Sequence, residues 1–304
     1  MVDRSLRVSF GGLRFENPLV LASGIADTTV GSMMRAIESG AGAAVSKSIG
    51  LEPRTGYKNP TLVATDSGLL NAVGLSNPGA RAFAEELSKV KGKGLPIIVS
   101  IFGGGPQEFA RVTEILEGNE FLAYELNLSC PHVEGVGTEI GHDPEIVAGV
   151  VKAVRAKTQK PIFAKLSANT HRTLEVGRAA VEAGATGLTA INSMGAMAIE
   201  VETARPTLAH KFGGLSGGAI RPIAVARIYE LYENLKVPII GCGGVSTWEH
   251  AVELILAGAS AVEVGTALYT GYGLFQEINR GIEQYMRRKK FRRVQEIVGL
   301  GHRF

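Results

Sequence analysis

Residues 122–132, with the sequence LAYELNLSCPH, contain the strand-to-loop transition that decides the fold. The first half, residues 122–126, has the apolar character of a strand that is buried in a sheet. The second half presents an amide, a hydroxyl and a thiol within four positions, on Asn127, Ser129 and Cys130. A buried strand that ends in hydrogen-bonding and reactive side chains indicates a scaffold with a functional site at its strand ends.

The same pattern recurs along the chain. Further apolar runs occur at 18–22, 43–46, 96–101, 161–166, 187–191, 237–241 and 261–264, and helical spacing lies between them, as at 80–90, 145–156, 173–183, 222–235 and 247–257. Eight strands that alternate with helices predict one parallel (β/α)8 TIM barrel domain over residues 1–304, in the α/β class. A doubly wound sheet is the alternative. Apolar alternation on both sides of Gly11-Gly12 predicts an N-terminal β-hairpin.

Composition supports an α/β protein built from aliphatic strands and tight turns, with 45% hydrophobic residues, 6% aromatic residues and 39 glycines. A basic run at 287–293 is interpreted as a solvated helix end or contact surface, because no aromatic stacking pattern accompanies it. The two cysteines are too few for a disulfide framework, and no run of 18 apolar residues occurs. We therefore expect a soluble, cytoplasmic protein without a nucleic-acid or membrane partner.

Two connections are too long to be ordinary loops, at residues 49–77 after the second strand and 193–218 after the sixth. Connections of this length are usually functional. Both leave the C-terminal ends of their strands, which is the face of a barrel where active sites form.

Polar and small residues occupy these strand ends throughout the chain. They are Ser23, Lys47, Ser48, Ser100, Asn127, Ser129, Cys130, Lys165, Asn192, Ser193, Gly243, Gly244, Gly265 and Thr266, and the first long connection adds Asn71. The glycine-rich ends of the seventh and eighth strands predict a phosphate site, since bare N–H groups and a helix N-terminus attract anions. The alternative for Gly243-Gly244 is a tight turn.

Lys47 and Lys165 are expected near the mouth of the barrel. Together with Asn71, Asn127 and Asn192, the two lysines suggest a site that neutralises a flat, oxygen-rich ligand and forms hydrogen bonds with it. Two alternatives stay open: a Schiff base on Lys165, and internal ion pairs with an acid such as Glu125 or Glu263.

Cys130 is interpreted as a general base or nucleophile, because a free thiol is already a few per cent ionised at neutral pH. The alternative, a small buried hydrophobe, is what we expect of Cys242. A metal site at His132 is not expected, since no second histidine lies at ligand spacing.

Taken together, these segments resemble the catalytic subunit of class 1B dihydroorotate dehydrogenases, the NAD-linked type. The matching segments are 21–24, 46–48, 71–75, 127–131, 164–167, 191–193, 205–206, 213–217, 241–244 and 265–267, in order along nearly the whole chain. The resemblance implies FMN as hydride acceptor at the barrel mouth and oxidation of (S)-dihydroorotate to orotate in pyrimidine biosynthesis.

The resemblance also implies residue roles. FMN would contact Ser23, Lys47, Ser48, Ser100, Asn127, Lys165, Ile191, Gly217, Gly243, Gly244, Gly265 and Thr266. The substrate would contact Lys47, Asn71, Ala72, Val73, Gly74, Leu75, Asn127, Asn192 and Ser193. Cys130 would be the general base, and Lys165 would stabilise charge on the reduced flavin.

The same resemblance implies a homodimer that joins a partner subunit carrying FAD and a [2Fe-2S] cluster, which passes electrons to NAD. Two separated cysteines cannot ligate such a cluster in this chain. Three positions depart from the family pattern, namely His132, Ala168 and Ser193. The Cys-Pro-His sequence also resembles dihydropyrimidine dehydrogenases, which are the alternative, followed by a lyase that uses Lys165.

Overall fold

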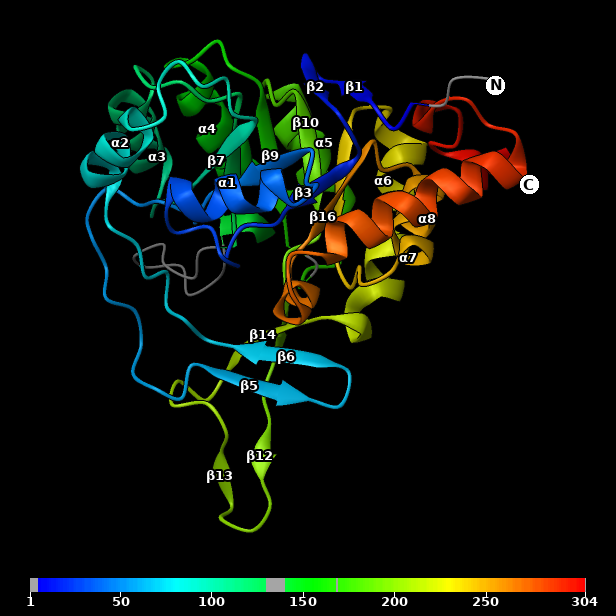
Figure 1. The fold of residues 1–304 in the computed structure, drawn as a ribbon. Helices are drawn as coiled ribbons and strands as arrows, with labels where there is room; N and C mark the ends of the chain where they lie inside the picture. The colour runs from blue at the N-terminus through cyan, green and yellow to red at the C-terminus, as the bar shows by residue number, and fades with distance from the viewer. Residues whose placement is uncertain (1–4, 130–139, 168, 304) are drawn as a thin grey trace.

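The computed structural model describes residues 5–129, 140–167 and 169–303 (Figure 1). Eight parallel strands close into a barrel, which confirms the predicted fold and excludes a doubly wound sheet. In barrel order they are β3 (Leu19–Leu21), β4 (Ala43–Val45), β7 (Ile97–Ile101), β8 (Ala123–Asn127), β9 (Ile162–Leu166), β10 (Gly187–Ala190), β15 (Ile239–Cys242) and β16 (Ala261–Val264).

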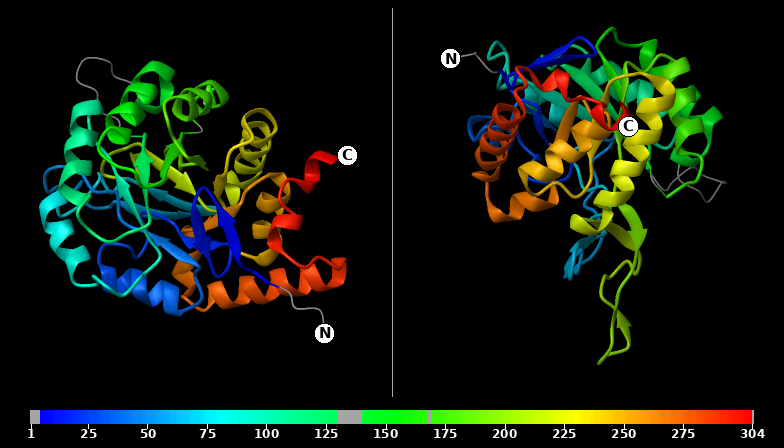
Figure 2. Two further views of the ribbon diagram at one scale, coloured as in Figure 1. Left: turned by 90° about the horizontal axis from the view of Figure 1, so that it is seen from above. Right: turned by 90° about the vertical axis from the view of Figure 1, so that its right-hand side faces the viewer.

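Helices surround the barrel (Figure 2). The α-helices are α1 (Val30–Glu38), α2 (Ala80–Ser88), α3 (Pro106–Leu116), α4 (Pro144–Arg155), α5 (Thr173–Glu182), α6 (Arg221–Leu235), α7 (Trp248–Ala257) and α8 (Leu274–Lys289). Short 3-10 helices are η1 (Ile140–His142), η2 (Gly218–Ile220), η3 (Thr266–Thr270), η4 (Val294–Glu296) and η5 (Leu300–Arg303). Within the described residues, no helix is both long and apolar enough to cross a membrane.

The strand boundaries follow from hydrogen-bonding capacity. Several strands begin one or two residues later than predicted, after Pro18, Pro96, Pro161 and Pro238, because proline has no N–H to donate to the ladder. At the other end, β8 extends to Asn127, which pairs with Lys165 of β9. Likewise β15 extends to Cys242, which pairs with Glu263 of β16. These residues are therefore held by the sheet rather than by loops.

The predicted N-terminal hairpin is present as β1 (Val8–Phe10) and β2 (Leu13–Phe15). It lies across the N-terminal end of the barrel, where the Phe10 ring makes an edge contact with Phe163 of β9 at 6.0 Å between centroids. A Cβ on Gly11 would lie 3.1 Å from Thr186 and 3.2 Å from Phe163, so the turn itself is seated against the strand starts. The hairpin closes this end of the barrel.

The two long connections fold together at the opposite end into what we call the arm (Figure 1). Its four-stranded sheet has the order β11 (Met194–Ala196), β14 (Gly213–Ser216), β6 (Gly68–Asn71) and β5 (Leu62–Thr65), and β12 (Ile199–Glu200) with β13 (Arg205–Pro206) extends it. The sequence had predicted connections without strands. The missed strands are two to four residues long and partly glycine, so they carry little β-propensity.

Candidate functional site

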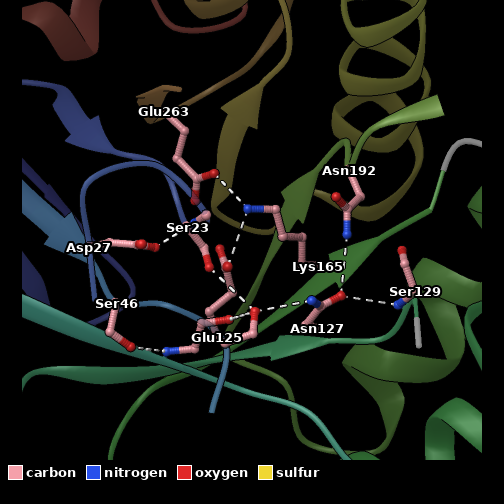
Figure 3. Close-up of polar contacts among 12 residues, drawn as sticks. Ser23, Asp27, Ser46, Glu125, Asn127, Ser129, Lys165, Asn192 and Glu263 are labelled. Atoms are coloured by element: carbon pink, nitrogen blue, oxygen red, sulfur yellow. Dashed lines mark hydrogen bonds and ion pairs between the residues drawn. The ribbon is translucent and has the colours of Figure 1, made fainter. Parts of the chain in front are cut away.

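Polar side chains from five strand ends form one continuous hydrogen-bond chain at the barrel mouth (Figure 3). Ser48 is its centre: its hydroxyl lies 3.3 Å from Ser23 Oγ and 3.0 Å from Ser100 Oγ, and it accepts from Asn127 Nδ2 at 3.0 Å. Asn192 Nδ2 then donates to Asn127 Oδ1 at 3.2 Å. The structure thus brings together the predicted residues of β3, β4, β7, β8 and β10 around one opening.

The arm meets this opening at Gly214. Asn71 Nδ2 donates to the Gly214 carbonyl at 3.0 Å, and a Cβ on Gly214 would lie only 2.2 Å from Ser193 Oγ. Ser193 N in turn donates to Asn192 Oδ1 at 2.8 Å. The two long connections therefore place Asn71 and Ser193 together, next to the polar chain of the mouth.

The other residues of the predicted substrate segment, 72–75, make different contacts. Ala72 is buried in a small separate cluster with Leu70 and Leu208. A Cβ on Gly74 would lie 2.8 Å from the Tyr57 ring, and Leu75 packs against the main core. Val73 is exposed. The side chain of Ala72 is thus covered by this cluster, whereas Leu75 is only partly buried, and a contact of this segment with the substrate stays a prediction.

The glycines predicted to bind phosphate also come together. A Cβ on Gly244 would lie 2.8 Å from the Gly217 carbonyl oxygen, and one on Gly243 would lie 3.6 Å from Ile191. Thr266 Oγ1, which follows Gly265 at the end of β16, donates to Ser216 Oγ at 2.7 Å. We call this group, Gly217, Gly243, Gly244, Gly265 and Thr266, the glycine cradle.

The cradle has the features of an anion site. Gly217, Gly243 and Gly244 have φ angles of 98°, 137° and 72°, a region that favours glycine. The chain leaves Gly217 through η2 directly into α6, a helix of 15 residues whose N-terminus therefore lies beside the cradle. Backbone N–H groups at a helix N-terminus and the helix dipole both favour a bound anion there.

Lys165 lies below the mouth between two carboxylates. Its Nζ is 3.2 Å from Glu125 Oε1 and 2.8 Å from Glu263 Oε2, and all three side chains are buried. The internal ion pair left open by the sequence is therefore present for Lys165, and it involves both acids at once. We call these three residues the buried triad.

Electrostatics within the triad favour a charged lysine. Burial alone lowers the pKa of Lys165, but the attraction of Glu125 and Glu263 outweighs it and raises that pKa well above its usual value. Burial, with repulsion from Glu263, raises the pKa of Glu125 to about 8. Burial and Glu263 also raise the pKa of the Cys242 thiol well above its usual range, although the residue is half-buried and not the fully buried hydrophobe that was predicted.

Asp27 is a buried residue of this region that sequence reasoning missed. Its carboxylate accepts from the N–H of Gly24, and its carbonyl accepts from Lys47 N at 3.1 Å. Burial raises its pKa to about 6, although the Gly24 N–H and the Lys47 charge act in the opposite direction. Asp27 thus ties the end of β3 to the end of β4, where Ser23, Lys47 and Ser48 lie.

Cys130, His132 and Ala168 lie outside the described residues. The last described residue before Cys130 is Ser129, whose N–H donates to Asn127 Oδ1 at 3.2 Å. Cys130 therefore follows directly on a residue that is hydrogen-bonded to the polar side chains of the mouth.

Fold and site together define a parallel (β/α)8 barrel with a polar opening, a glycine cradle and a buried ammonium at the C-terminal ends of its strands. The family model of dihydroorotate dehydrogenase matches residues 5–286. The chain belongs to the dihydroorotate dehydrogenase family.

Curated relatives match this chain over nearly their whole length. The chain is 52% identical to the dihydroorotate dehydrogenase B (NAD(+)) catalytic subunit of Pyrococcus furiosus over 302 residues, which cover 98% of this chain and 99% of that protein. It is 46% identical to the protein of the same name from Methanocella arvoryzae, with 96% of each covered. Among solved structures, the enzyme of Eimeria tenella in complex with ferulenol matches in fold, with a TM-score of 0.82 at 22% identity, over 98% of this chain and 89% of that one.

Proposed function

We propose that this chain oxidises dihydroorotate to orotate, with FMN bound at the barrel mouth. The observation that supports this function best is the hydrogen-bond chain from Ser23 to Asn192, which lies above a buried ammonium and belongs to a chain of the dihydroorotate dehydrogenase family.

The residues present fit FMN in two respects. Three glycines of the cradle have positive φ beside the N-terminus of α6, where backbone N–H groups can approach an anion without a side chain between them. The mouth offers hydroxyls and amides, which can both donate and accept and therefore suit a ring with alternating N–H and C=O groups. When bound, FMN would supply a two-electron acceptor for a hydride.

The chain's own side chains would then divide the remaining work. Asn71, Asn127, Asn192 and Ser193 would hold the substrate ring by hydrogen bonds, with Lys47 nearby. Lys165 would favour negative charge on the cofactor ring. Cys130 would take the proton from C5 of dihydroorotate while the hydride leaves C6, so that a C=C bond forms in the product.

Two other functions are less well supported. A Schiff-base lyase needs a neutral amine, whereas Lys165 lies between two carboxylates that hold it as an ammonium. A dihydropyrimidine dehydrogenase was suggested by Cys-Pro-His, but the family model and the curated relatives all carry the name dihydroorotate dehydrogenase.

The proposal extends to partners. Relatives named as catalytic subunits of an NAD(+) enzyme support a second subunit, for which we propose FAD, a [2Fe-2S] cluster and electron transfer to NAD. We further propose a homodimer within a heterotetramer, in the cytoplasm. Orotate formation by the isolated chain with an artificial electron acceptor would test the core of the proposal, and a chain that binds no FMN after reconstitution would contradict it.

Cys130→Ser tests the role of the proposed base. A serine hydroxyl is essentially un-ionised at neutral pH, whereas a few per cent of a thiol is ionised, and general-base catalysis contributes about 10²- to 10⁴-fold. We expect flavin reduction by dihydroorotate to slow by at least about 100-fold at neutral pH. Stopped-flow absorbance measures this rate, and the flavin spectrum verifies that the variant still holds FMN. Reduction at the wild-type rate would remove Cys130 from the role.

A further inference from the structure

The buried triad contains one more negative charge than positive charge if all three groups are ionised. Lys165 supplies one ammonium, and Glu125 and Glu263 supply two carboxylates. Their side chains are 6%, 1% and 0% exposed, respectively, so water does not compensate the excess charge. An uncompensated buried charge is costly enough that a protein usually neutralises it by binding a proton.

Among the described residues that act on Glu125 and Lys165, none is a second cation that could balance the pair. The triad spans the barrel interior from β8 and β9 to β16, and the groups that face it are the Cys242 thiol of β15 and, at longer range, Asp27 after β3. Both are acids. Lys47 acts on Asp27 and is not among the groups that act on Glu125.

Two carboxylate oxygens also lack partners. Glu125 Oε2 and Glu263 Oε1 are fully buried, and neither has a hydrogen-bond partner among the described residues. A carboxylic acid differs from a carboxylate in having an O–H to donate. One proton on either glutamate would therefore add a hydrogen-bond donor where two oxygens have no partner. The same proton would cancel the excess negative charge.

We propose that Glu125 and Glu263 share one proton and act as positioning residues, which hold the Lys165 ammonium at the base of the barrel mouth. The position of Lys165 supports this assignment, because it pairs in the sheet with Asn127, a member of the polar chain at the mouth. The pKa of Glu125, raised to about 8 by burial and by Glu263, agrees with a proton retained at neutral pH.

The consequence for the cofactor rests on the proposed function. Two-electron reduction adds negative charge to the ring of FMN, which the ammonium stabilises and an extra carboxylate charge opposes. While the shared proton is present the triad is neutral overall. When it is lost at higher pH, the triad becomes negative and reduction becomes harder.

Infrared spectroscopy of the flavin-free full-length chain tests the shared proton by itself. At about pH 7.5, above the pKa of Asp27 at about 6, we expect the carbonyl band of a protonated carboxylic acid in the wild type. The band should disappear in both Glu125→Gln and Glu263→Gln, since each leaves a single carboxylate paired with Lys165. Glu114→Gln, which removes an exposed carboxylate paired with Lys157, should keep it. A wild type without the band, or variants that retain it, would overturn the shared proton.

The midpoint potential of bound FMN tests the positioning role. Between about pH 6 and about pH 10 the wild-type potential should fall below that of both glutamine variants once the shared proton is lost. We expect a difference of at least tenfold in the ratio of oxidised to reduced cofactor, or about 30 mV for a two-electron couple. Parallel curves for wild type and variants would overturn the positioning role. A chain that binds no FMN would instead refute the proposed function, and the infrared result would still decide on the proton.

Discussion

At the residue scale, Asp27 shows what the sequence does not reveal about this site. It lies in a short segment after the first strand and has no motif around it, so no sequence pattern marks it as part of a site. In the structure it is 1% exposed, its carboxylate accepts from the Gly24 N–H and its carbonyl accepts from Lys47 N. Lys47 and Ser48 were predictable because they end a strand, whereas burial of Asp27 depends on residues distant in sequence.

The raised pKa of Asp27 gives a stability prediction. Its pKa rises from 3.8 in the unfolded chain to about 6 in the fold, so between these values the folded state binds the proton more tightly. Asp27 therefore destabilises the fold as pH rises from about 4 to about 6, by roughly 3 kcal/mol at 1.36 kcal/mol per pKa unit. Asp27→Asn should remove this dependence. Urea unfolding of both proteins from about pH 4 to about pH 7 measures the difference, and parallel curves would contradict the prediction.

At the scale of elements, the parts of the barrel were largely predictable and the arm was not. Barrel strands are buried on both faces, so they appear as continuous aliphatic runs, as in β7, and glycine ends helices at Gly40, Gly184 and Gly258 with positive φ. The arm has strands of two to four residues with partly exposed side chains, such as β5 and β14. Their pairing depends on contacts between the two connections, which no local pattern encodes.

Gly244 follows the end of β15 and packs against Arg221, the first residue of α6. A Cβ there would lie 2.7 Å from Arg221 Cβ and 2.8 Å from the Gly217 carbonyl, so we expect Gly244→Ala to displace the cradle and weaken FMN binding at least tenfold. Gly92→Ala is the matched control, because Gly92 also has a positive φ but a Cβ there would meet nothing within 4 Å. Titration of flavin-free protein with FMN measures both affinities. Equal affinities for the two variants would exclude the cradle as the phosphate site.

At the scale of the whole molecule, the arm carries much of the exposed apolar surface of the described residues. Its large exposed hydrophobic side chains are Tyr57, Leu62, Val73, Met197, Ile199, Val201 and Phe212. Exposed apolar side chains that gather on one part of a molecule are typical of surfaces that another protein covers. We therefore predict that the homodimer proposed above is formed through the arm.

Val201→Asp tests this surface. Val201 is 82% exposed, so the charge should leave the fold intact while it opposes burial in an interface, and we expect the homodimer to dissociate at least tenfold more readily. Tyr269→Asp, at a side chain that is 79% exposed but lies on η3, should leave association unchanged. Analytical ultracentrifugation measures both. A dimer of unaltered affinity in Val201→Asp would exclude this part of the arm.

The N-terminal hairpin has a kinetic consequence for the proposed reaction. Because β1 and β2 cover the N-terminal end of the barrel, with Phe10 against Phe163, we infer that a ligand at the mouth is reached from the end that carries the arm. Dihydroorotate and orotate would then share a single route. Product has to leave before the next substrate can enter, so excess orotate should compete with dihydroorotate for the same oxidised enzyme.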